Sequence, residues 1–326
     1  MERRINRSIF SVLVVVMLFV GQLTASIPAL ASSDPVNGNI AYGHIAALSD
    51  EIGSRLEGTQ GRKDAANYIK QEFATLGYTV SSQPFSYMVK RDNQNVKITS
   101  ENLIVEKKGI SEKQIIVGAH YDSVAIGRGA DDNGSAIGVM LEVAKKLKDT
   151  VTPYTIKFIA FGGEEDNLKG SKHYVGQMTQ KEIKNTVNMI VLDSLIAGNV
   201  KYVYGDFGSA GVIRDLTLKI SDELGLGIIT QPGTEKYPVG TTGPFSDHVP
   251  FTNVGIPYTY FEATDWSLGA LDGYTQVDYN YGVNGEIWHT EYDNLGYIEA
   301  SFPGRVQDHL DSYVTALTEV LSRFGK

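Results

Sequence analysis

An acidic loop between an apolar run and an amphipathic segment does most to restrict the fold of this chain. Residues 114–119 are short, β-branched and bounded by glycine, which predicts a buried strand. Residues 135–148 place apolar side chains at helical spacing and end in lysines, which predicts a helix whose dipole favours that basic end. A strand, an acidic loop and a helix in this order are typical of open α/β sheets, where ligands bind at the carboxyl ends of strands.

The same alternation recurs along the chain. Further strands are predicted at residues 78–87, 102–107, 154–161, 187–192, 201–204 and 256–261. Further helices are predicted at residues 61–76, 211–224 and 307–324. We therefore expect one α/β domain with a mostly parallel, mixed β-sheet flanked by helices on both faces. Residues 230–244 and 266–285 are long and lack periodicity, so we expect them to form the walls of a pocket.

The first 31 residues have the features of a secretory signal peptide. Residues 1–7 are basic, residues 8–20 form a nearly unbroken apolar run, and residues 29–31 end in a small-x-small cleavage site. The apolar run is shorter than the roughly 20 residues that a membrane span needs. We therefore expect a secreted, extracellular protein whose mature domain is residues 32–326, with no membrane contact after cleavage. Association with the cell wall stays open.

The composition excludes some partners and some means of stabilisation. The formal net charge is −9 and becomes more negative once the basic signal peptide is removed, so nucleic acid and anionic membranes are poor partners. The chain has no cysteine, so a secreted form has no disulfides. Its hydrophobic core or bound metal ions must hold it together.

Acidic and imidazole side chains follow the predicted strands. His120 ends the first strand, Glu164 and Glu165 follow residues 154–161, Asp193 follows residues 187–192, and His289 follows the short run Glu-Ile-Trp at residues 286–288. We expect them at the same edge of the sheet. Two histidines with several carboxylates and no thiolate suit Zn²⁺ or Mn²⁺. The alternatives are a histidine that only caps its strand and an acidic loop that is only solvated.

Two pairs of adjacent carboxylates favour the metal site. Asp131–Asp132 and Glu164–Glu165 would repel within each pair unless solvent or a cation separated their charges. One glutamate can bind metal while its neighbour removes a proton from water, which is the arrangement of a metal-activated hydrolase. Asp122 lies two residues after His120 on extended backbone, so it can accept a hydrogen bond from the ring nitrogen that does not face the metal.

Six motifs give the chain its resemblance to secreted co-catalytic di-zinc aminopeptidases, metallopeptidase family twenty-eight. The motifs are Gly-Ala-His-x-Asp-Ser at 118–123, Gly-Ala-Asp-Asp-Asn-Gly-Ser at 129–135, Phe-Gly-Gly-Glu-Glu at 161–165 followed by Gly170-Ser171, Leu-Asp at 192–193, Ser-Asp-His at 246–248, and His-Thr-x-x-Asp-Asn at 289–294. They occur in the family's order, and the resemblance covers roughly residues 50–320. Residues 32–326 would then be a zinc peptidase domain.

The resemblance implies a site with two Zn²⁺ ions per chain. His120 and Asp193 would hold one ion, Glu165 and His289 would hold the other, and Asp132 would bridge the two. Two ions about 3.5–4 Å apart can polarise a scissile carbonyl and share the nucleophilic hydroxide.

The resemblance also implies roles for the neighbouring residues. Glu164 would be the general base and later the proton donor to the leaving amine, and Asp122 would orient His120. Asp131 and His248 would lie beside the site without binding metal. Some relatives have a tyrosine before the last histidine ligand, to stabilise the oxyanion, whereas this chain has Trp288. A tyrosine of residues 274–281 is the candidate replacement.

We therefore expect a monomeric, zinc-dependent aminopeptidase that hydrolyses N-terminal residues from peptides with a free N-terminus. The alternative is a glutaminyl cyclase-like, single-zinc acyltransferase built on the same sheet, which differs in its metal count and in forming pyroglutamate. A third hypothesis is a solute-binding or adhesion protein that has kept the fold, and the presence of Glu164 disfavours it.

Overall fold

The structure is a computed structural model in which residues 37–326 are described. The predicted signal peptide, residues 1–31, lies outside them. Within residues 37–326 there is no helix with the length and apolar character that a membrane span requires.

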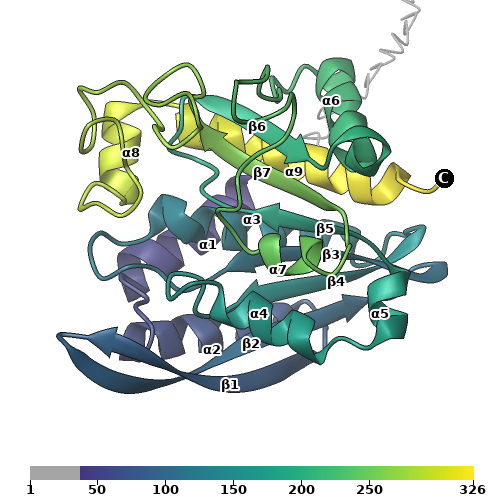
Figure 1. The fold of residues 1–326 in the computed structure, drawn as a ribbon, viewed down its shortest axis with the longest axis horizontal. Helices are drawn as coiled ribbons and strands as arrows, with labels where there is room; N and C mark the ends of the chain where they lie inside the picture. Colours follow the sequence, from purple (N-terminus) through teal and green to yellow (C-terminus); the bar gives the residue numbers. More distant parts are fainter. Residues whose placement is uncertain (1–36) are drawn as a thin grey trace, which may run out of the picture. The chain divides into compact units, whose positions relative to one another are not determined.

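Seven strands within residues 37–326 form one mixed sheet in the order β1-β2-β4-β3-β5-β7-β6 (Figure 1). Their bounds are β1 Val80–Arg91, β2 Gln94–Lys107, β3 Ser111–His120, β4 Tyr154–Phe161, β5 Thr186–Leu192, β6 Val200–Gly205 and β7 Tyr258–Thr264. The central strands β4, β3, β5 and β7 run parallel, whereas β1, β2 and β6 pair antiparallel at the two edges. The parallel strands are the most continuously apolar ones, as expected for strands covered on both faces.

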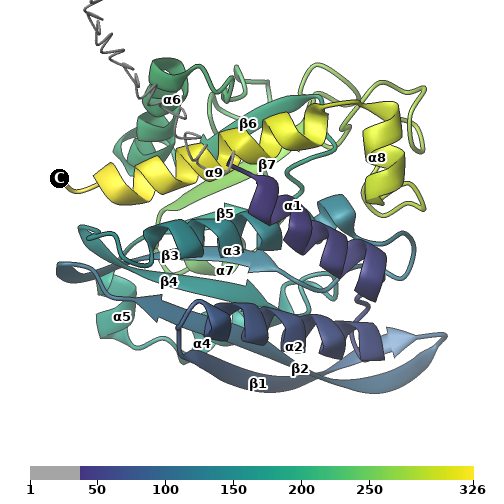
Figure 2. The ribbon, with the colours of Figure 1, turned by 180° about the vertical axis from the view of Figure 1, so that it is seen from behind.

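Helices cover both faces of this sheet, which confirms the predicted fold class (Figures 1 and 2). The helices on one face are α1 Asn39–Ala46, α2 Gln60–Thr75, α3 Ala136–Leu147 and α9 Arg305–Arg323, with α6 Val212–Leu224 packed on α9 and β6. The other face carries α4 Lys169–Gln177, α5 Gln180–Asn185 and α7 Val249–Thr252, and α8 Leu295–Ser301 precedes α9. Each face has its own buried hydrophobic cluster, because alternate residues of each strand point to opposite sides.

The predicted strands and helices are present, and the differences lie in short or tightly turned segments. The strands predicted at residues 78–87 and 102–107 extend toward each other, so that β1 and β2 form one long hairpin that turns at Asp92 and Asn93. Both turn residues have positive φ, which short polar side chains tolerate in hairpin turns. The short helices α5, α7 and α8 were not predicted because four to seven residues contain too few turns to show a period.

Residues 286–288, Glu-Ile-Trp, were expected to form a strand that delivers His289 to the sheet edge. This expectation was wrong, because Glu286 makes only an isolated bridge with Val283 and the segment is a loop. Gln276, in the 266–285 loop beside this segment, accepts hydrogen bonds from its backbone N–H groups in place of a neighbouring strand.

Candidate metal centre

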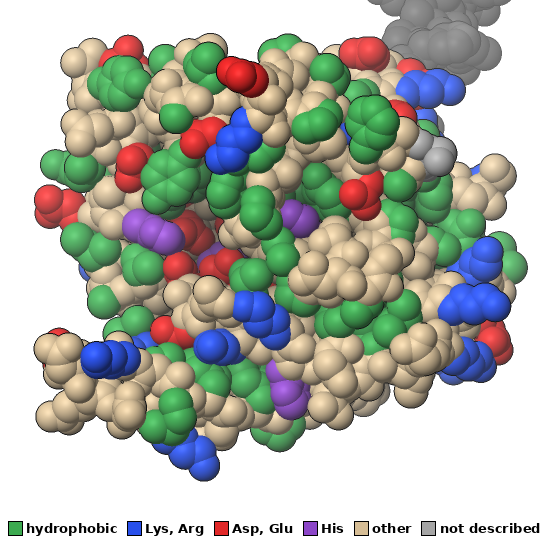
Figure 3. Space-filling view, in the orientation of Figure 1, with side chains coloured by type: hydrophobic (Ala, Val, Ile, Leu, Met, Phe, Trp, Pro, Cys, Tyr) green, Lys and Arg blue, Asp and Glu red, His purple; other side chains and the backbone are tan. Residues whose placement is uncertain are grey.

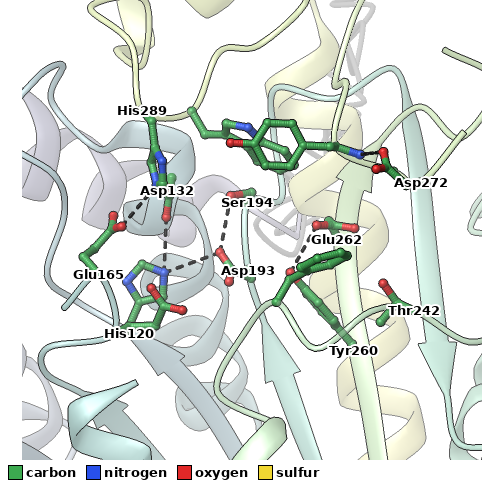
Figure 4. A pocket seen from close by; sticks show the side chains of 15 residues that line it. His120, Asp132, Glu165, Asp193, Ser194, Thr242, Tyr260, Glu262, Asp272 and His289 are labelled. Carbon is green, nitrogen blue, oxygen red and sulfur yellow. Dashed lines mark hydrogen bonds and ion pairs between the residues drawn. The ribbon is translucent and has the colours of Figure 1, made fainter. Parts of the chain in front are cut away.

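The predicted ligands meet at the carboxyl edge of the parallel strands (Figure 4). His120 is the last residue of β3, and Asp132 lies in the irregular turn, residues 130–135, that leads into α3. Glu165 follows β4, Asp193 follows β5, and His289 comes from the loop before α8. All five line one cavity, and acidic and histidine side chains gather in a hollow on this face of the molecule (Figure 3).

The five side chains form two groups that share Asp132. His120 Nε2 lies 3.2 Å from Asp132 Oδ1 and 3.5 Å from Asp193 Oδ1. His289 Nε2 lies 3.1 Å from Asp132 Oδ2 and 3.1 Å from Glu165 Oε2. Within each group the candidate ligand atoms all lie within 4.8 Å of one another. Asp132 therefore presents one carboxylate oxygen to each group.

The charges of the site favour a bound cation. Burial opposes ionisation of Asp132, but the hydrogen bonds from His120 and His289 outweigh it and lower the pKa of that carboxyl. The hydrogen bonds to Asp132 and Glu165 raise the pKa of His289 to about 11. Glu165 Oε1 is buried and has no hydrogen-bond partner among the described residues. The two groups combine imidazole nitrogens with a larger number of carboxylates. This set of ligands fits Zn²⁺, which binds imidazole and carboxylate groups.

Glu164 lines the same cavity but belongs to neither group. Burial raises the pKa of Glu164, and the negative charges of Asp247 and Asp193 raise it further. A carboxyl group with a raised pKa is suited to accept and return a proton near neutral pH.

Asp122 fixes the loop that carries both glutamates. Its carboxylate is fully buried and accepts hydrogen bonds of 3.2 Å each from the backbone N–H groups of Glu164 and Glu165. The ring of His120 lies 3.2 Å from the Asp122 carbonyl oxygen through Nδ1, but 3.7 Å from the carboxylate. Asp122 therefore contacts His120 mainly through its main chain, and its side chain holds the glutamate loop.

The comparison with known families agrees with this geometry. A model of Peptidase family M28 matches residues 102–314. The chain belongs to this family. The matched residues lie within the range over which the motifs predicted the resemblance, and this M28 peptidase is a metallo-aminopeptidase of the hydrolase class.

Individual relatives and solved structures are similar over half of the chain or more. The alkaline phosphatase isozyme conversion protein of Escherichia coli is 34% identical over 326 aligned residues, covering 92% of this chain and 94% of that protein. Aminopeptidase YwaD of Bacillus subtilis is 36% identical over 170 residues, 50% of this chain and 35% of that protein. A zinc aminopeptidase structure from Bacillus subtilis has a TM-score of 0.70 at 21% identity, covering 90% of this chain and 97% of that chain. Porphyromonas gingivalis glutaminyl cyclase has a TM-score of 0.66 at 20% identity, covering 88% and 99%.

A second layer of buried carboxylates aligns the ligand loops of the peptidase. Asp293 accepts hydrogen bonds from the backbone N–H groups of Asp131 (2.7 Å) and Asp132 (3.2 Å). Asp131 Oδ1 accepts hydrogen bonds from the N–H groups of Ile196 (2.8 Å) and Ala197 (3.0 Å), just after Asp193. Asp131 therefore joins the Asp132 turn to the Asp193 loop and lies in neither ligand group.

Gln276 extends this layer to the His289 loop. Its side-chain amide donates to Asp131 Oδ2 (2.6 Å), and its Oε1 accepts from the N–H groups of Ile287 (2.9 Å) and Trp288 (2.8 Å). His289 itself has a φ of 57°, in the left-handed region that costs a non-glycine residue about 1–2 kcal/mol. The hydrogen bonds of Gln276 therefore hold a strained loop next to the predicted ligand His289.

The Ser-Asp-His segment supports the site from the side of α7. Ser246 Oγ donates to Asp193 Oδ2 at 2.7 Å, which orients that carboxylate. His248 stacks on Tyr258 with ring centroids 4.6 Å apart and lies in neither ligand group. Burial lowers the pKa of His248 to about 4, as for a histidine that stays neutral in a packed interior.

The residue before His289 is Trp288, an aromatic residue that has no hydroxyl group. Trp288 is buried, and its indole nitrogen has no hydrogen-bond partner among the described residues. Tyr274 lies against it, with ring centroids 5.4 Å apart, and lines the cavity with half of its surface exposed. Of residues 274–281, Tyr274 is thus the tyrosine that the structure brings to the cavity.

Besides Gln276, Arg55 and Glu262 at the site were missed from the sequence. Arg55 is fully buried and donates to five backbone carbonyls, among them Tyr121 O and Gly129 O at 2.8 Å each, which fixes the chain on both sides of the acidic loop. No local pattern marks it, because its acceptors are main-chain atoms. Glu262 lines the cavity from β7, and it could have been found from the alternation Tyr258-x-Tyr260-x-Glu262 in a buried strand.

Proposed function

We propose that this M28 peptidase holds two Zn²⁺ ions per chain and removes N-terminal residues from peptides. The observation that supports it best is the division of the Asp132 carboxylate between two separate groups of ligands. His120 and Asp193 would complete one ion site, and Glu165 and His289 would complete the other. Each site has imidazole and carboxylate donors only, which suits zinc.

The chain's own residues supply the proton transfers. Bound zinc would polarise the scissile carbonyl and lower the pKa of the attacking water. Glu164 would take a proton from that water, and its raised pKa lets it then return the proton to the leaving amine. Asp122 would keep Glu164 in place, since it holds the backbone of that residue.

The substrate and the location of the enzyme are part of the same proposal. The substrates would be peptides with a free N-terminus, and the enzyme would act outside the cell as a monomer made of residues 32–326. The basic and apolar pattern of residues 1–31 supports export, and the strongly negative charge disfavours nucleic acid as a partner.

Metal analysis and one substitution test the proposal. Purified protein should contain two equivalents of zinc, and Glu164→Gln should keep both while kcat falls by about 10²–10⁴-fold. Glu235→Gln, which removes an exposed carboxylate outside the cavity, is the matched control and should keep full activity. Full activity of Glu164→Gln, or of protein after exhaustive chelation, would contradict the mechanism.

The second candidate is a glutaminyl cyclase-like acyltransferase with one zinc. The fold likeness to the Porphyromonas gingivalis enzyme supports it. The two ligand groups favour the aminopeptidase, because a single ion would leave one group without a cation. An assay for pyroglutamate formation from glutaminyl peptides, run beside the aminopeptidase assay, separates the two functions.

A further inference from the structure

The cavity of the metal centre continues past the ligands into a side pocket. From Asp193 and Ser194 the cavity extends to Tyr260 and Glu262 on β7 and then to Asp272 (Figure 4). Its volume is about 180 Å³. This volume includes the space at the metal centre. A cavity of about 150 Å³ accepts a benzene-sized group, so the whole cavity is large enough to hold one amino-acid side chain.

The wall of this side pocket contains a buried carboxylate where an apolar residue is expected. Along β7, Tyr258 and Tyr260 point to one hydrophobic cluster and Phe261 and Ala263 point to the other. Glu262 is two residues after Tyr260, so it points to the same side of the strand as the two tyrosines, and it is 7% exposed. Burying a carboxylate in such a position costs free energy unless it is paired or hydrogen-bonded.

The protein gives Glu262 hydrogen bonds but no counter-ion. Tyr204 donates to Glu262 Oε2 at 2.9 Å, Tyr260 donates to Oε1 at 3.1 Å, and Trp266 fixes Tyr204 through a bond of 2.6 Å. Among residues 37–326, the nitrogens of lysine, arginine and histidine all lie more than 4.0 Å from this carboxylate. Burial raises the pKa of Glu262 to about 8, and the charge of Asp193 adds to the effect.

The rest of the pocket suits a long side chain with a cationic end. The described residues that line the cavity include no lysine or arginine, and Asp272 adds a second carboxylate at its outer end. Phe245, Tyr274 and Trp288 supply aromatic walls. Aromatic faces bind the aliphatic stem of lysine or arginine and attract the charged group.

We infer that the side pocket binds the side chain of the substrate's first residue, that this residue is lysine or arginine, and that Glu262 is the residue that selects it. The inference rests on the proposed aminopeptidase function and adds a substrate class to it. A cation from the substrate would pair with the carboxylate that the protein itself leaves without one, and a buried pair of this kind discriminates strongly against neutral side chains.

Chromogenic p-nitroanilides of lysine, norleucine, arginine and leucine test the inference. Lysine and norleucine share an unbranched aliphatic stem and differ in the terminal ammonium, so their ratio measures the contribution of charge. The wild-type enzyme should prefer lysine and arginine, and Glu262→Gln should lower their kcat/KM by about 10- to 100-fold while norleucine and leucine stay within a few-fold. Glu235→Gln should keep the wild-type ranking.

A binding measurement tests the same point without turnover. Glu164→Gln protein loaded with zinc should bind lysinamide about 10-fold more tightly than norleucinamide in calorimetry, and the double variant with Glu262→Gln should bind both equally.

The outcomes separate the two proposals. If all four anilides resist cleavage, the aminopeptidase function is wrong. If norleucine and leucine are cleaved as well as lysine and arginine by the wild-type enzyme, the function stands and the inference is overturned. An equal loss on all four substrates in Glu262→Gln also overturns it, because that result places Glu262 at the α-ammonium that all four share.

Discussion

Substitution of Gln276 tests whether the second layer of buried polar groups holds the metal centre together. Gln276→Met keeps the length of the side chain and removes its three hydrogen bonds. Asp131 Oδ2 and the N–H groups of Ile287 and Trp288 would then be buried without a partner. Each such group costs about 1–3 kcal/mol, and apolar packing of the methionine recovers part of this. We therefore expect Gln276→Met to lower the free energy of unfolding by about 4 kcal/mol.

Urea unfolding and zinc titration measure the two consequences. The unfolding midpoint of chelated protein should fall, and the Tm should drop by roughly 10 °C for a domain of this size. Because the loop of His289 loses its anchor, zinc affinity at the group of Asp132, Glu165 and His289 should fall by about 10- to 100-fold. The group of His120 and Asp193 should keep its affinity.

Gln231 provides a matched control. It is also fully buried with three hydrogen bonds, to Pro238, Thr241 and Gly233, but it serves a loop that carries no predicted ligand. Gln231→Met should lose comparable stability and bind zinc normally. The reasoning fails if Gln276→Met is as stable as the wild type, or if both variants lose zinc affinity to the same extent.

Two further substitutions probe stability without removing a predicted ligand. Arg55→Lys should lower the free energy of unfolding in urea by about 2–4 kcal/mol, because an ammonium cannot reproduce the five hydrogen bonds of the buried guanidinium. Arg128→Lys, at an exposed site, should lower it by less than about 1 kcal/mol, and equal losses in the two variants would refute this. Burial lowers the pKa of His309 to about 3, so between that pH and about 6.5 the unfolded chain binds a proton that the folded chain does not. Stability therefore decreases as the pH is lowered through this window. Between pH 7 and pH 5 this residue should account for about 2 kcal/mol, so His309→Gln should lose that much less than the wild type, and identical pH profiles would contradict it.

The meeting of the five predicted ligand residues at one site could be predicted because strands and motifs locate them independently of tertiary packing. His120, Glu165 and Asp193 each follow an apolar run that becomes a parallel strand, and the ends of such strands meet at one edge. His289 was located by its motif, although the strand expected before it is absent. Its position instead depends on Gln276, whose hydrogen bonds to a distant loop leave no local pattern in the sequence.

The residues that could not be predicted act through the main chain or through cross-strand contacts. Arg55 binds carbonyl oxygens, which every residue has, so its partners cannot be read from side-chain types. Glu262 is different, since its strand shows the alternation that places it inside. The alternation does not reveal the register between β6 and β7, which brings Tyr204 to the Glu262 carboxylate.

If two ions bind as proposed, the shared carboxylate of Asp132 also affects the order in which they enter. One oxygen faces each ligand group, so an ion in either group changes the charge that the other group offers. The second cation would meet a carboxylate already partly neutralised, together with the repulsion of the first. Loading would therefore be stepwise with unequal affinities, and the singly loaded enzyme would be a distinct species rather than a mixture of empty and full molecules.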